Sequence, residues 1–248
     1  MPVLVAAATG LELRAALKLE ADARQGRLFE TLAHGRPVLA LVTGIGVVNA
    51  ALALGRALER ADISGVLNLG VAGSFDLAAH PLGSVRLVER EIWPEYGLLF
   101  SGAVAADARA LGFALDGAPA SDAEAVFDRL AWDAPAEARR LGIDPSGFAR
   151  ATSLTVSGVT ADAGRARELS ARFGAGLENM EGFALAYGAR RSGLPFAELR
   201  AVSNAVGSRP PKDWDLPGAL AALGRAAEHI LAPVAEPGQT DSNFNQRT

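Results

Sequence analysis

The chain has 248 residues, which fits one large α/β domain with an ample buried core. Half of its residues are hydrophobic, 6% are aromatic and the formal net charge is −4, so it offers no basic stripe for a nucleic-acid backbone. Cysteine is absent, which excludes a disulfide framework, a thiolate metal site and a cysteine nucleophile.

The N-terminal segment, residues 1–8, is apolar but lacks the basic region of a secretory leader, so it is interpreted as a first strand. No apolar run reaches the roughly 20 residues that a membrane-spanning helix needs. We therefore expect a cytoplasmic protein that binds neither membranes nor nucleic acid and whose partner is a small molecule.

Short apolar, β-branched runs alternate with stretches of helical period, which predicts an α/β fold with covered sheet faces. The expected strands are 3–8, 27–33, 37–43, 65–70, 84–91, 151–156, 174–178 and 196–203. The expected helices are 10–24, 47–61, 122–141, 162–173, 180–193 and 216–231. Residues 113–150 are interpreted as a helical insertion. We predict one domain over residues 1–233 and a polar, disordered tail over 234–248.

Glu12 follows the first strand directly, at the mouth of the expected sheet. A carboxylate in this place can act as the general base on a water molecule. The alternative is a solvated glutamate in the first turn of a helix, where it favours the helix dipole.

A glycine turn at residues 43–49 leaves the next buried strand and opens a helix, so its backbone, Gly46 included, can approach a ligand closely. The turn nearly matches a dinucleotide-binding fingerprint, but Asn49 replaces the third glycine, which argues against nicotinamide binding. A turn without a ligand is the alternative.

The segment 68–76 also leaves a strand, and it contains the sequence Gly-Val-Ala-Gly at residues 70–73. Backbone groups of Val71, Ala72 and Gly73 could line a cleft beyond the end of the strand. A plain strand-to-loop turn explains the same pattern.

Two carboxylates and an amide interrupt the junction of an apolar strand with an Ala-rich helix at residues 178–184. A carboxylate here can accept hydrogen bonds from two sugar hydroxyls, and such bonds strengthen as a sugar becomes oxocarbenium-like. The alternative is that Glu178 and Glu181 only favour the positive end of the helix.

The apolar strand that starts at residue 196 ends in the pair Ser203-Asn204. An asparagine amide can donate to a carbonyl and accept from a protonated ring nitrogen, which are the groups that a departing 6-oxopurine presents. Adenine presents the reverse pattern at its exocyclic group, so a site built for one base should reject the other. Asn204 as a simple turn residue is the alternative.

These motifs, taken together and in order, resemble the nucleoside phosphorylase/nucleosidase superfamily over most of the chain. Within it the chain is most similar to the futalosine hydrolases and next to the methylthioadenosine/S-adenosylhomocysteine nucleosidases. The resemblance implies a three-layer α/β/α sandwich with a mixed, partly barrel-like central sheet, a homo-oligomer (dimer or higher) and no cofactor. The three histidines, His34, His80 and His229, also lack the spacing of metal ligands.

The resemblance further implies roles for single residues. Glu12 matches the carboxylate that activates the attacking water, and Arg200 matches the arginine that supports the site from behind. Met180 and Glu181 match the pair that packs on the ribose and binds its hydroxyls. Asn204 stands where the family meets N7 of the leaving base. The remaining substrate-binding candidates are Gly46, Val71, Ala72, Gly73, Asn179 and Ser203.

The chain departs from the adenine-specific nucleosidases at two positions. They carry Asp where this chain has Asn204, which favours hypoxanthine here, and Ser where it has Val71, which removes a polar contact near the sugar or the water. Futalosine bears a carboxylated aryl ketone on its sugar, so Arg209 is a candidate for the carboxylate and Trp214 for the ring. A solvated arginine and a tryptophan that only caps the last helix are the alternatives.

The sequence therefore predicts hydrolysis of the N-glycosidic bond of futalosine, with release of hypoxanthine and dehypoxanthine futalosine in menaquinone biosynthesis. A purine nucleoside phosphorylase is one alternative, and it would need cations such as Arg86 or Arg90 turned toward a phosphate. An adenine-specific nucleosidase is another. A nucleoside-binding regulatory protein without chemistry is the alternative from a different class, although it would not need Glu12.

Overall fold

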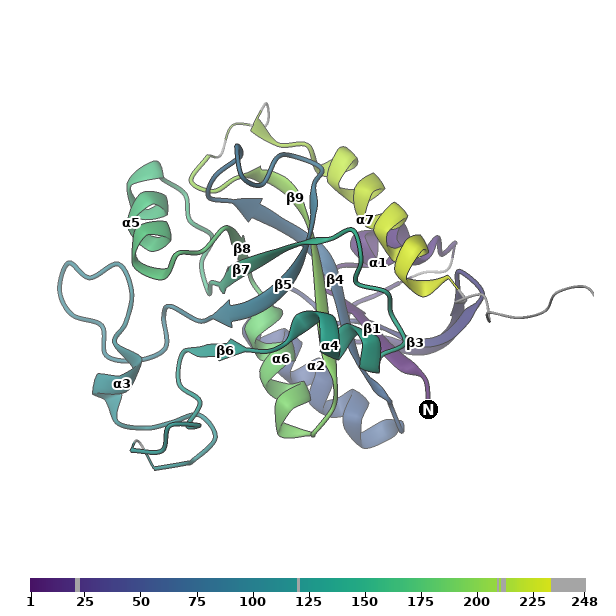
Figure 1. Ribbon diagram of the computed structural model, residues 1–248, viewed down its shortest axis with the longest axis horizontal. Helices are drawn as coiled ribbons and strands as arrows, with labels where there is room; N and C mark the ends of the chain where they lie inside the picture. Colours follow the sequence, from purple (N-terminus) through teal and green to yellow (C-terminus); the bar gives the residue numbers. More distant parts are fainter. Residues whose placement is uncertain (21–22, 120, 209, 211–212, 233–248) are drawn as a thin grey trace, which may run out of the picture.

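The computed structural model describes residues 1–20, 23–119, 121–208, 210 and 213–232. Over these residues the backbone forms a mixed nine-stranded sheet with helices on both sides, which confirms the predicted α/β/α fold class (Figure 1). The strands are β1 (Val3–Ala7), β2 (Leu28–Ala33), β3 (Arg36–Val42), β4 (Gly65–Ser74), β5 (Val85–Ile92), β6 (Arg129–Ala131), β7 (Ala149–Thr155), β8 (Leu177–Asn179) and β9 (Phe196–Ala205).

Part of the sheet closes on itself. Strand β9 pairs in parallel with β4 and antiparallel with β5, while β8 and β7 join β4 to β5 by another path. The strands β4, β8, β7, β5 and β9 therefore form a closed ring, and β1, β3 and β2 extend from β4 as an open arm. Closure removes the free edges of these strands, and the sheet is partly barrel-like, as the resemblance implied.

Helices pack on both faces of the sheet, and Figure 1 shows α7 and α1 on one side and α2 and α6 on the other. Helix α5 packs against β7, and α3 lies in the long connection between β5 and β6. The helices are α1 (Gly10–Leu17), α2 (Val47–Arg60), α3 (Ala108–Leu111), α4 (Ala134–Arg140), α5 (Ala163–Phe173), α6 (Gly182–Arg191) and α7 (Leu216–Leu231).

The central strands are mostly apolar because helices cover both of their faces. All five residues of β1 are buried, and β9 is buried from Phe196 to Asn204. Buried polar residues interrupt this core, among them Asn68 on β4 and the charged residues Glu198 and Arg200 on β9. Buried charges need partners, so these positions mark where the fold supports a polar centre.

The structure contradicts the first half of the helix predicted over residues 122–141. It also contradicts the helical insertion over 113–150, because α4 is the one helix among the described residues of that segment. Residues 113–119 and 121–128 form turns and loops, β6 follows, and helix α4 begins only after its N-cap Asp133. Val126 and Leu130 pack on the core beside α6, so tertiary packing decided this segment. Pro135 at the start of α4 fits a first-turn position, where its missing N–H costs nothing.

The helix expected over residues 10–24 is shorter than predicted. Helix α1 ends at Leu17 because Lys18 adopts a left-handed backbone conformation, with φ 53°, and closes the last turn onto the Arg14 carbonyl. The Lys18 ammonium then pairs with Glu228 of α7 at 2.9 Å.

No helix in the described part of the chain is long and apolar enough to cross a membrane. The predicted disordered tail, residues 234–248, lies outside the described residues.

Candidate active site

A cleft of about 330 Å³ opens where β1, β4 and β9 end, next to the junction of β8 and α6. Ligands of α/β sheets commonly bind beyond the carboxyl ends of strands in this way. The cleft brings together ten of the residues that the sequence singled out: Glu12, Val71, Ala72, Gly73, Asn179, Met180, Glu181, Ser203, Asn204 and Trp214.

The cleft has two chemically different parts. We call Glu12, Glu181, Asn204 and the underlying Arg200 the polar floor; all four are buried. The half-exposed apolar side chains around the opening form what we call the apolar rim: Leu11, Ile45, Val159, Trp214, Leu216 and Leu220.

Glu12 is fixed at the start of α1 by a reciprocal capping box. Its Oε2 accepts from the backbone N–H of Thr9 at 2.9 Å and from the Thr9 hydroxyl at 2.7 Å. Its Oε1 accepts from the backbone N–H of Val71 at 3.0 Å, which ties α1 to β4. Three donors thus orient one carboxylate that still lines the cleft, so a residue that caps the helix also presents an acid–base group to the cleft.

Glu181 lies at the N-terminus of α6, opposite Glu12. Its Oε1 accepts from the backbone N–H of Gly46 at 3.0 Å, and its Oε2 lies 3.6 Å from Nη1 of Arg200. Gly46 has φ 92°, which glycine adopts without strain, and this conformation aims its N–H at the carboxylate. The glycine turn therefore serves the cleft by holding Glu181.

Asn179 organises the backbone around Glu181. Its Oδ1 accepts from the N–H groups of Glu181 and Gly182, at 2.8 and 2.7 Å, and from Nη2 of Arg200 at 3.1 Å. Its Nδ2 donates to Glu91 at 2.6 Å and to Ser153 at 2.7 Å. Because the amide is engaged by the protein on both sides, Asn179 acts on the cleft by fixing the α6 terminus, with Met180 beside it on the lining.

Asn204 and Ser203 lie at the end of β9. The Asn204 Oδ1 accepts from the Ser203 hydroxyl at 2.8 Å, and its Nδ2 donates to the Ala205 carbonyl at 3.0 Å. An amide has two N–H donors and two acceptor lone pairs, so one of each remains for a ligand. The pattern matches a ligand that offers a carbonyl next to an N–H.

The electrostatics of the floor centre on one cation. Burial raises the pKa of Glu181 above its ordinary value, whereas Arg200 and the Gly46 N–H lower it and the charges of Glu12 and Glu198 raise it again. Burial alone would lower the pKa of Arg200, but Glu198 and Glu181 hold it above the ordinary value. Arg200 therefore stays a cation beneath the cleft.

The sequence also singled out Trp214 and three arginines. Arg209 is outside the described residues. Trp214 lines the cleft and donates its indole N–H to the Ser208 carbonyl at 3.2 Å. Arg86 donates to His80 and to the Ala79 carbonyl, and Arg90 is exposed on β5. Among the described residues that line the cleft, none is Lys or Arg.

The sequence did not predict most of the side chains around the opening of the cleft, nor the contact between Glu178 and Thr160. Of the rim residues only Trp214 was predicted, and Leu11, Ile45 and Val159 are each about half exposed. Glu178 accepts from both the N–H and the hydroxyl of Thr160, which holds the loop that carries Val159. Burial raises the pKa of Glu178, and these two hydrogen bonds lower it. No local pattern in the sequence signalled this long-range contact.

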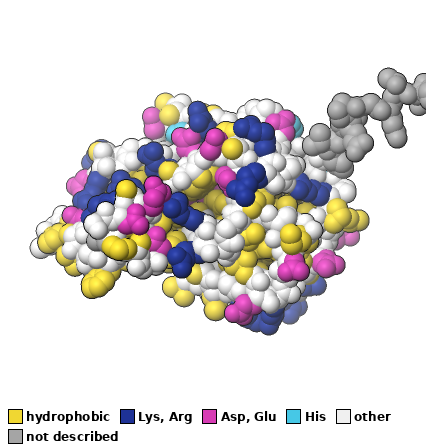
Figure 2. Space-filling view, turned by 60° about the horizontal axis from the view of Figure 1, so that its bottom comes forward, with side chains coloured by type: hydrophobic (Ala, Val, Ile, Leu, Met, Phe, Trp, Pro, Cys, Tyr) yellow, Lys and Arg dark blue, Asp and Glu magenta, His cyan; other side chains and the backbone are white. Residues whose placement is uncertain are grey.

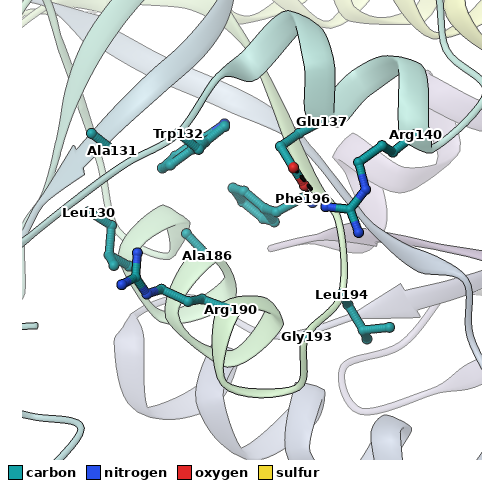
Figure 3. Close-up of a pocket in the computed structure, with 10 residues that line it drawn as sticks. All are labelled: Leu130, Ala131, Trp132, Glu137, Arg140, Ala186, Arg190, Gly193, Leu194 and Phe196. Atoms are coloured by element: carbon teal, nitrogen blue, oxygen red, sulfur yellow. Dashed lines mark hydrogen bonds and ion pairs between the residues drawn. The ribbon is translucent and has the colours of Figure 1, made fainter. Parts of the chain in front are cut away.

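A second cavity, of about 260 Å³, lies at the start of β9, whereas the cleft lies at its end (Figure 3). Figure 3 shows Glu137 and Arg140 of α4 turned toward each other, and they form an ion pair at 2.7 Å. Glu137 also accepts from the Phe196 N–H at 3.3 Å. Its carboxylate is thus already partnered, and this cavity lacks the acid–base groups that the cleft assembles.

Among the described residues, no group of three or more His, Asp or Glu could hold a metal ion. The chemistry available to the cleft is that of carboxylates, an amide and a guanidinium.

Comparison with known proteins agrees with this geometry. A family model described as the phosphorylase superfamily matches residues 2–235. The chain is 36% identical to futalosine hydrolase of Thermus thermophilus over 222 residues, which are 87% of this chain and 92% of that protein. It is 47% identical to futalosine hydrolase of Streptomyces coelicolor over 103 residues, 41% of this chain and 43% of that protein.

Solved structures share the fold at lower identity. A 5′-methylthioadenosine/S-adenosylhomocysteine nucleosidase of Helicobacter pylori aligns with a TM-score of 0.69 and 16% identity, over 91% of this chain and 95% of that chain. A futalosine hydrolase of the same organism aligns with a TM-score of 0.65 and 16% identity, over 93% and 94%. At such identities the likeness shows the fold alone.

Proposed function

This chain belongs to the phosphorylase superfamily, and from that premise we propose that it hydrolyses the N-glycosidic bond of futalosine. The reaction releases hypoxanthine and dehypoxanthine futalosine, a step of menaquinone biosynthesis. The observation that carries the proposal is one cleft in which Glu12, Glu181 and Asn204 converge from separate elements. The curated relatives named futalosine hydrolase support the choice of substrate.

On the base side, Asn204 meets the departing purine. Its free N–H donates to O6 of hypoxanthine, and its Oδ1 accepts from the protonated N7, so negative charge that builds on the base is stabilised. The Ser203 hydroxyl, which donates to Oδ1, fixes the orientation of the amide. Adenine would place an amino group against the donating N–H, and a buried mismatch of this kind is strongly rejected.

On the sugar side, Glu181 binds the ribose hydroxyls while Met180 packs on the ring. As the C1′–N9 bond breaks, the sugar becomes cationic, and the hydrogen bonds to the carboxylate strengthen. The Gly46 N–H and Arg200 hold the carboxylate so that it does not need to reorganise during the reaction.

On the water side, Glu12 removes a proton from the water that attacks C1′. The backbone N–H of Val71 orients Glu12, while the carbonyl of Val71 accepts from Arg200 at 3.3 Å. Val71 thus contacts the polar floor through its peptide N–H and carbonyl. Its side chain is apolar and cannot hydrogen-bond to water, so Glu12 orients the attacking water. Because no described residue lining the cleft is a cation, water is favoured over phosphate as the acceptor.

The apolar rim receives the 5′ substituent of futalosine. The indole of Trp214 stacks on the aryl ketone, and Leu216 and Leu220 lie beside it on the lining. Arg209, five residues before Trp214 in the sequence, binds the carboxylate.

The protein acts as a homo-oligomer, a dimer or higher, with one nucleosidase domain over residues 1–233. Figure 2 brings the α2 and α6 side of the molecule forward and shows hydrophobic side chains gathered on it. Val48 and Leu52 of α2 are 77% and 61% exposed and continue the line of Ile45 at the rim. A second copy packed on α2 would cover them and narrow the cleft; sedimentation of the wild type and of Leu52→Glu tests this. The absence of cysteine fits a cytoplasmic setting.

The experiment that tests the function is base release from futalosine, aminofutalosine, methylthioadenosine and inosine, with and without phosphate. We expect hypoxanthine from futalosine at a rate that is independent of phosphate. A requirement for phosphate would identify a phosphorylase. Faster turnover of methylthioadenosine would identify an adenine-specific nucleosidase, and saturable binding without base release would identify a binding protein.

A further inference from the structure

Two carboxylates lie beneath the polar floor and are not part of the mechanism described above. Glu91 on β5 and Glu198 on β9 are both 0% exposed. A Cβ placed on Gly182 would collide with Oε1 of both, so the two carboxyl groups meet under the first residue of α6. Glycine is needed there because the two acids occupy the space of a side chain.

Glu91 holds the elements around Glu181 together. It accepts from the Thr155 hydroxyl and from Nδ2 of Asn179, each at 2.6 Å. Thr155 in turn accepts from the Phe183 N–H at 2.7 Å, and Asn179 accepts from the N–H groups of Glu181 and Gly182. Glu91 is thus connected through single side chains to three successive N–H groups at the start of α6.

Glu198 has one strong partner and one unsatisfied oxygen. Its Oε1 accepts from Nε of Arg200 at 2.6 Å. Its Oε2 is buried and has no donor within hydrogen-bond geometry among the described residues, and Nδ2 of Asn68, its partner in register on β4, is likewise buried without an acceptor. An unpaired buried carboxylate oxygen is costly, so a donor is expected at this place.

The charges around Arg200 indicate that one of these carboxyl groups is protonated. Three carboxyl groups interact with Arg200, namely Glu181, Glu91 and Glu198. Several ionised carboxylates around one buried cation are not stable, and two that share a site keep one proton between them. Glu198 lies 2.6 Å from Nε of Arg200 and is therefore the ionised member, whereas Glu91 accepts, among the described residues, only from neutral donors; burial and the Glu198 charge raise the pKa of Glu91, as expected for the protonated member.

We propose that Glu91 is a neutral carboxylic acid that donates its proton to Glu198, and that this acid pair is a positioning device for Glu181. The proposal rests on the proposed function in that Glu181 is the group served. The O–H of Glu91 supplies a donor to the Glu198 carboxylate where the two groups meet under Gly182, and hydrogen bonds from Glu91 and Asn68 lower the pKa of Glu198.

The acid pair determines how closely Arg200 approaches Glu198 and Glu181. With Glu198 ionised, Arg200 is held at 2.6 Å from Glu198 and remains 3.6 Å from Glu181. The negative charge of Glu181 is therefore only partly neutralised and stays available to the cationic sugar. If Glu198 were neutral, Arg200 would turn to Glu181 and form a closer ion pair, which would weaken the attraction between Glu181 and the sugar.

The first experiment detects the proton and needs no substrate. Infrared spectra of the wild type at about pH 7 should contain a carbonyl band of a protonated carboxylic acid. Glu91→Gln should remove this band, because glutamine replaces the neutral acid with a similar shape. The matched control is Glu89→Gln, a half-exposed glutamate on the same strand that pairs with Arg150, and it should keep the band. Absence of the band, or its persistence in Glu91→Gln, would overturn the proposal.

The second experiment separates the two acids by kinetics. Glu198→Gln should lower kcat by about 30-fold with little change in KM, whereas Glu91→Gln should lose less than about 5-fold. In Glu198→Gln the acid limb of the kcat profile should move to lower pH, because the neighbouring anion is gone and Arg200 is closer to Glu181. Equal losses in both variants, or an unmoved acid limb in Glu198→Gln, would contradict the proposal.

Both outcomes remain separable from the proposed function. Circular dichroism and binding of a non-hydrolysable nucleoside identify a variant that has failed to fold. If futalosine were not the substrate, the infrared result would stand, and the kinetic comparison would be made on whichever nucleoside is cleaved.

Discussion

The polar floor and the apolar rim of the cleft are built in different ways. On the floor each carboxylate is held by donors from another element: Glu12 by Val71, and Glu181 by Gly46. On the rim, Leu11, Ile45 and Val159 are about half exposed and touch the cleft only through carbon. The floor is therefore organised before substrate arrives, as charge stabilisation in a transition state requires, whereas the rim selects by shape and burial. Substitutions should change kcat on the floor and KM on the rim.

The largest effect is expected at the water side of the floor. Glu12→Gln keeps the shape of the side chain but cannot take a proton, so kcat for futalosine should fall by about 10³-fold with a nearly unchanged KM. Stopped-time assays of hypoxanthine release measure it. Thr9→Val removes one of the donors to Glu12 and is the control; it should lose far less.

Glu181→Gln comes next, because it removes the charge that faces the cationic sugar. We expect a fall in kcat of about 10²-fold. An equally large rise in KM with unchanged kcat would show that Glu181 contributes only to ground-state binding, and the distinction between floor and rim would then fail at this residue.

The pH profile follows from the same carboxylate. Burial raises the pKa of Glu181, and activity requires its ionised form, so kcat should fall with decreasing pH from a higher pH than an ordinary glutamate would give. The acid limb should be absent from the residual activity of Glu181→Gln. An identical limb in that variant would assign it to another group.

Asn204→Asp tests the base side of the floor. A carboxyl that donates to N7 accepts from a 6-amino group, so the variant should lose about 10²-fold in kcat/KM for futalosine while aminofutalosine improves relative to it. The ratio of the two kcat/KM values is the measurement. A variant that keeps its preference for futalosine would remove Asn204 from substrate choice.

The smallest effect is expected on the rim. Trp214→Leu should raise KM for futalosine by about 5-fold, through lost stacking on the aryl ketone, and leave inosine nearly unaffected. Competition between the two substrates in one assay reports the difference directly. Equal effects on both nucleosides would place Trp214 in a structural role.

The sequence predicts the floor better than the rim, for physical reasons. Glu12 and Asn204 stand where apolar strands end, and polar residues at such ends are a local signal. The contact of Gly46 with Glu181 spans 135 residues and depends on how β1 and β4 place β3 and β8 in the sheet, which no local pattern contains. Apart from Trp214, which the resemblance suggested, the rim residues are ordinary leucines, isoleucine and valine, and their exposure appears only when the elements are assembled.

The sequence also contains local signals of the polar network beneath the floor. Glu198 and Arg200 interrupt an otherwise apolar run over residues 196–202, and Glu91 directly precedes the buried Ile92; charges in such places signal a buried polar network. The predicted helix was wrong over the segment 122–131, because tertiary packing overrode a local signal. Its alanines and charges have helical propensity, but Val126 and Leu130 are drawn into the core as a loop and a short strand.

The central claim is that Glu12, Glu181 and Asn204 together hydrolyse a 6-oxopurine nucleoside. The most direct test is a time course of purified protein with futalosine in phosphate-free buffer, with hypoxanthine and the sugar product quantified for the wild type and Glu12→Gln. The account predicts one hypoxanthine per futalosine consumed by the wild type, a free sugar product, and a rate in Glu12→Gln that is lower by about 10³-fold. No release without phosphate, or full activity in Glu12→Gln, would contradict it.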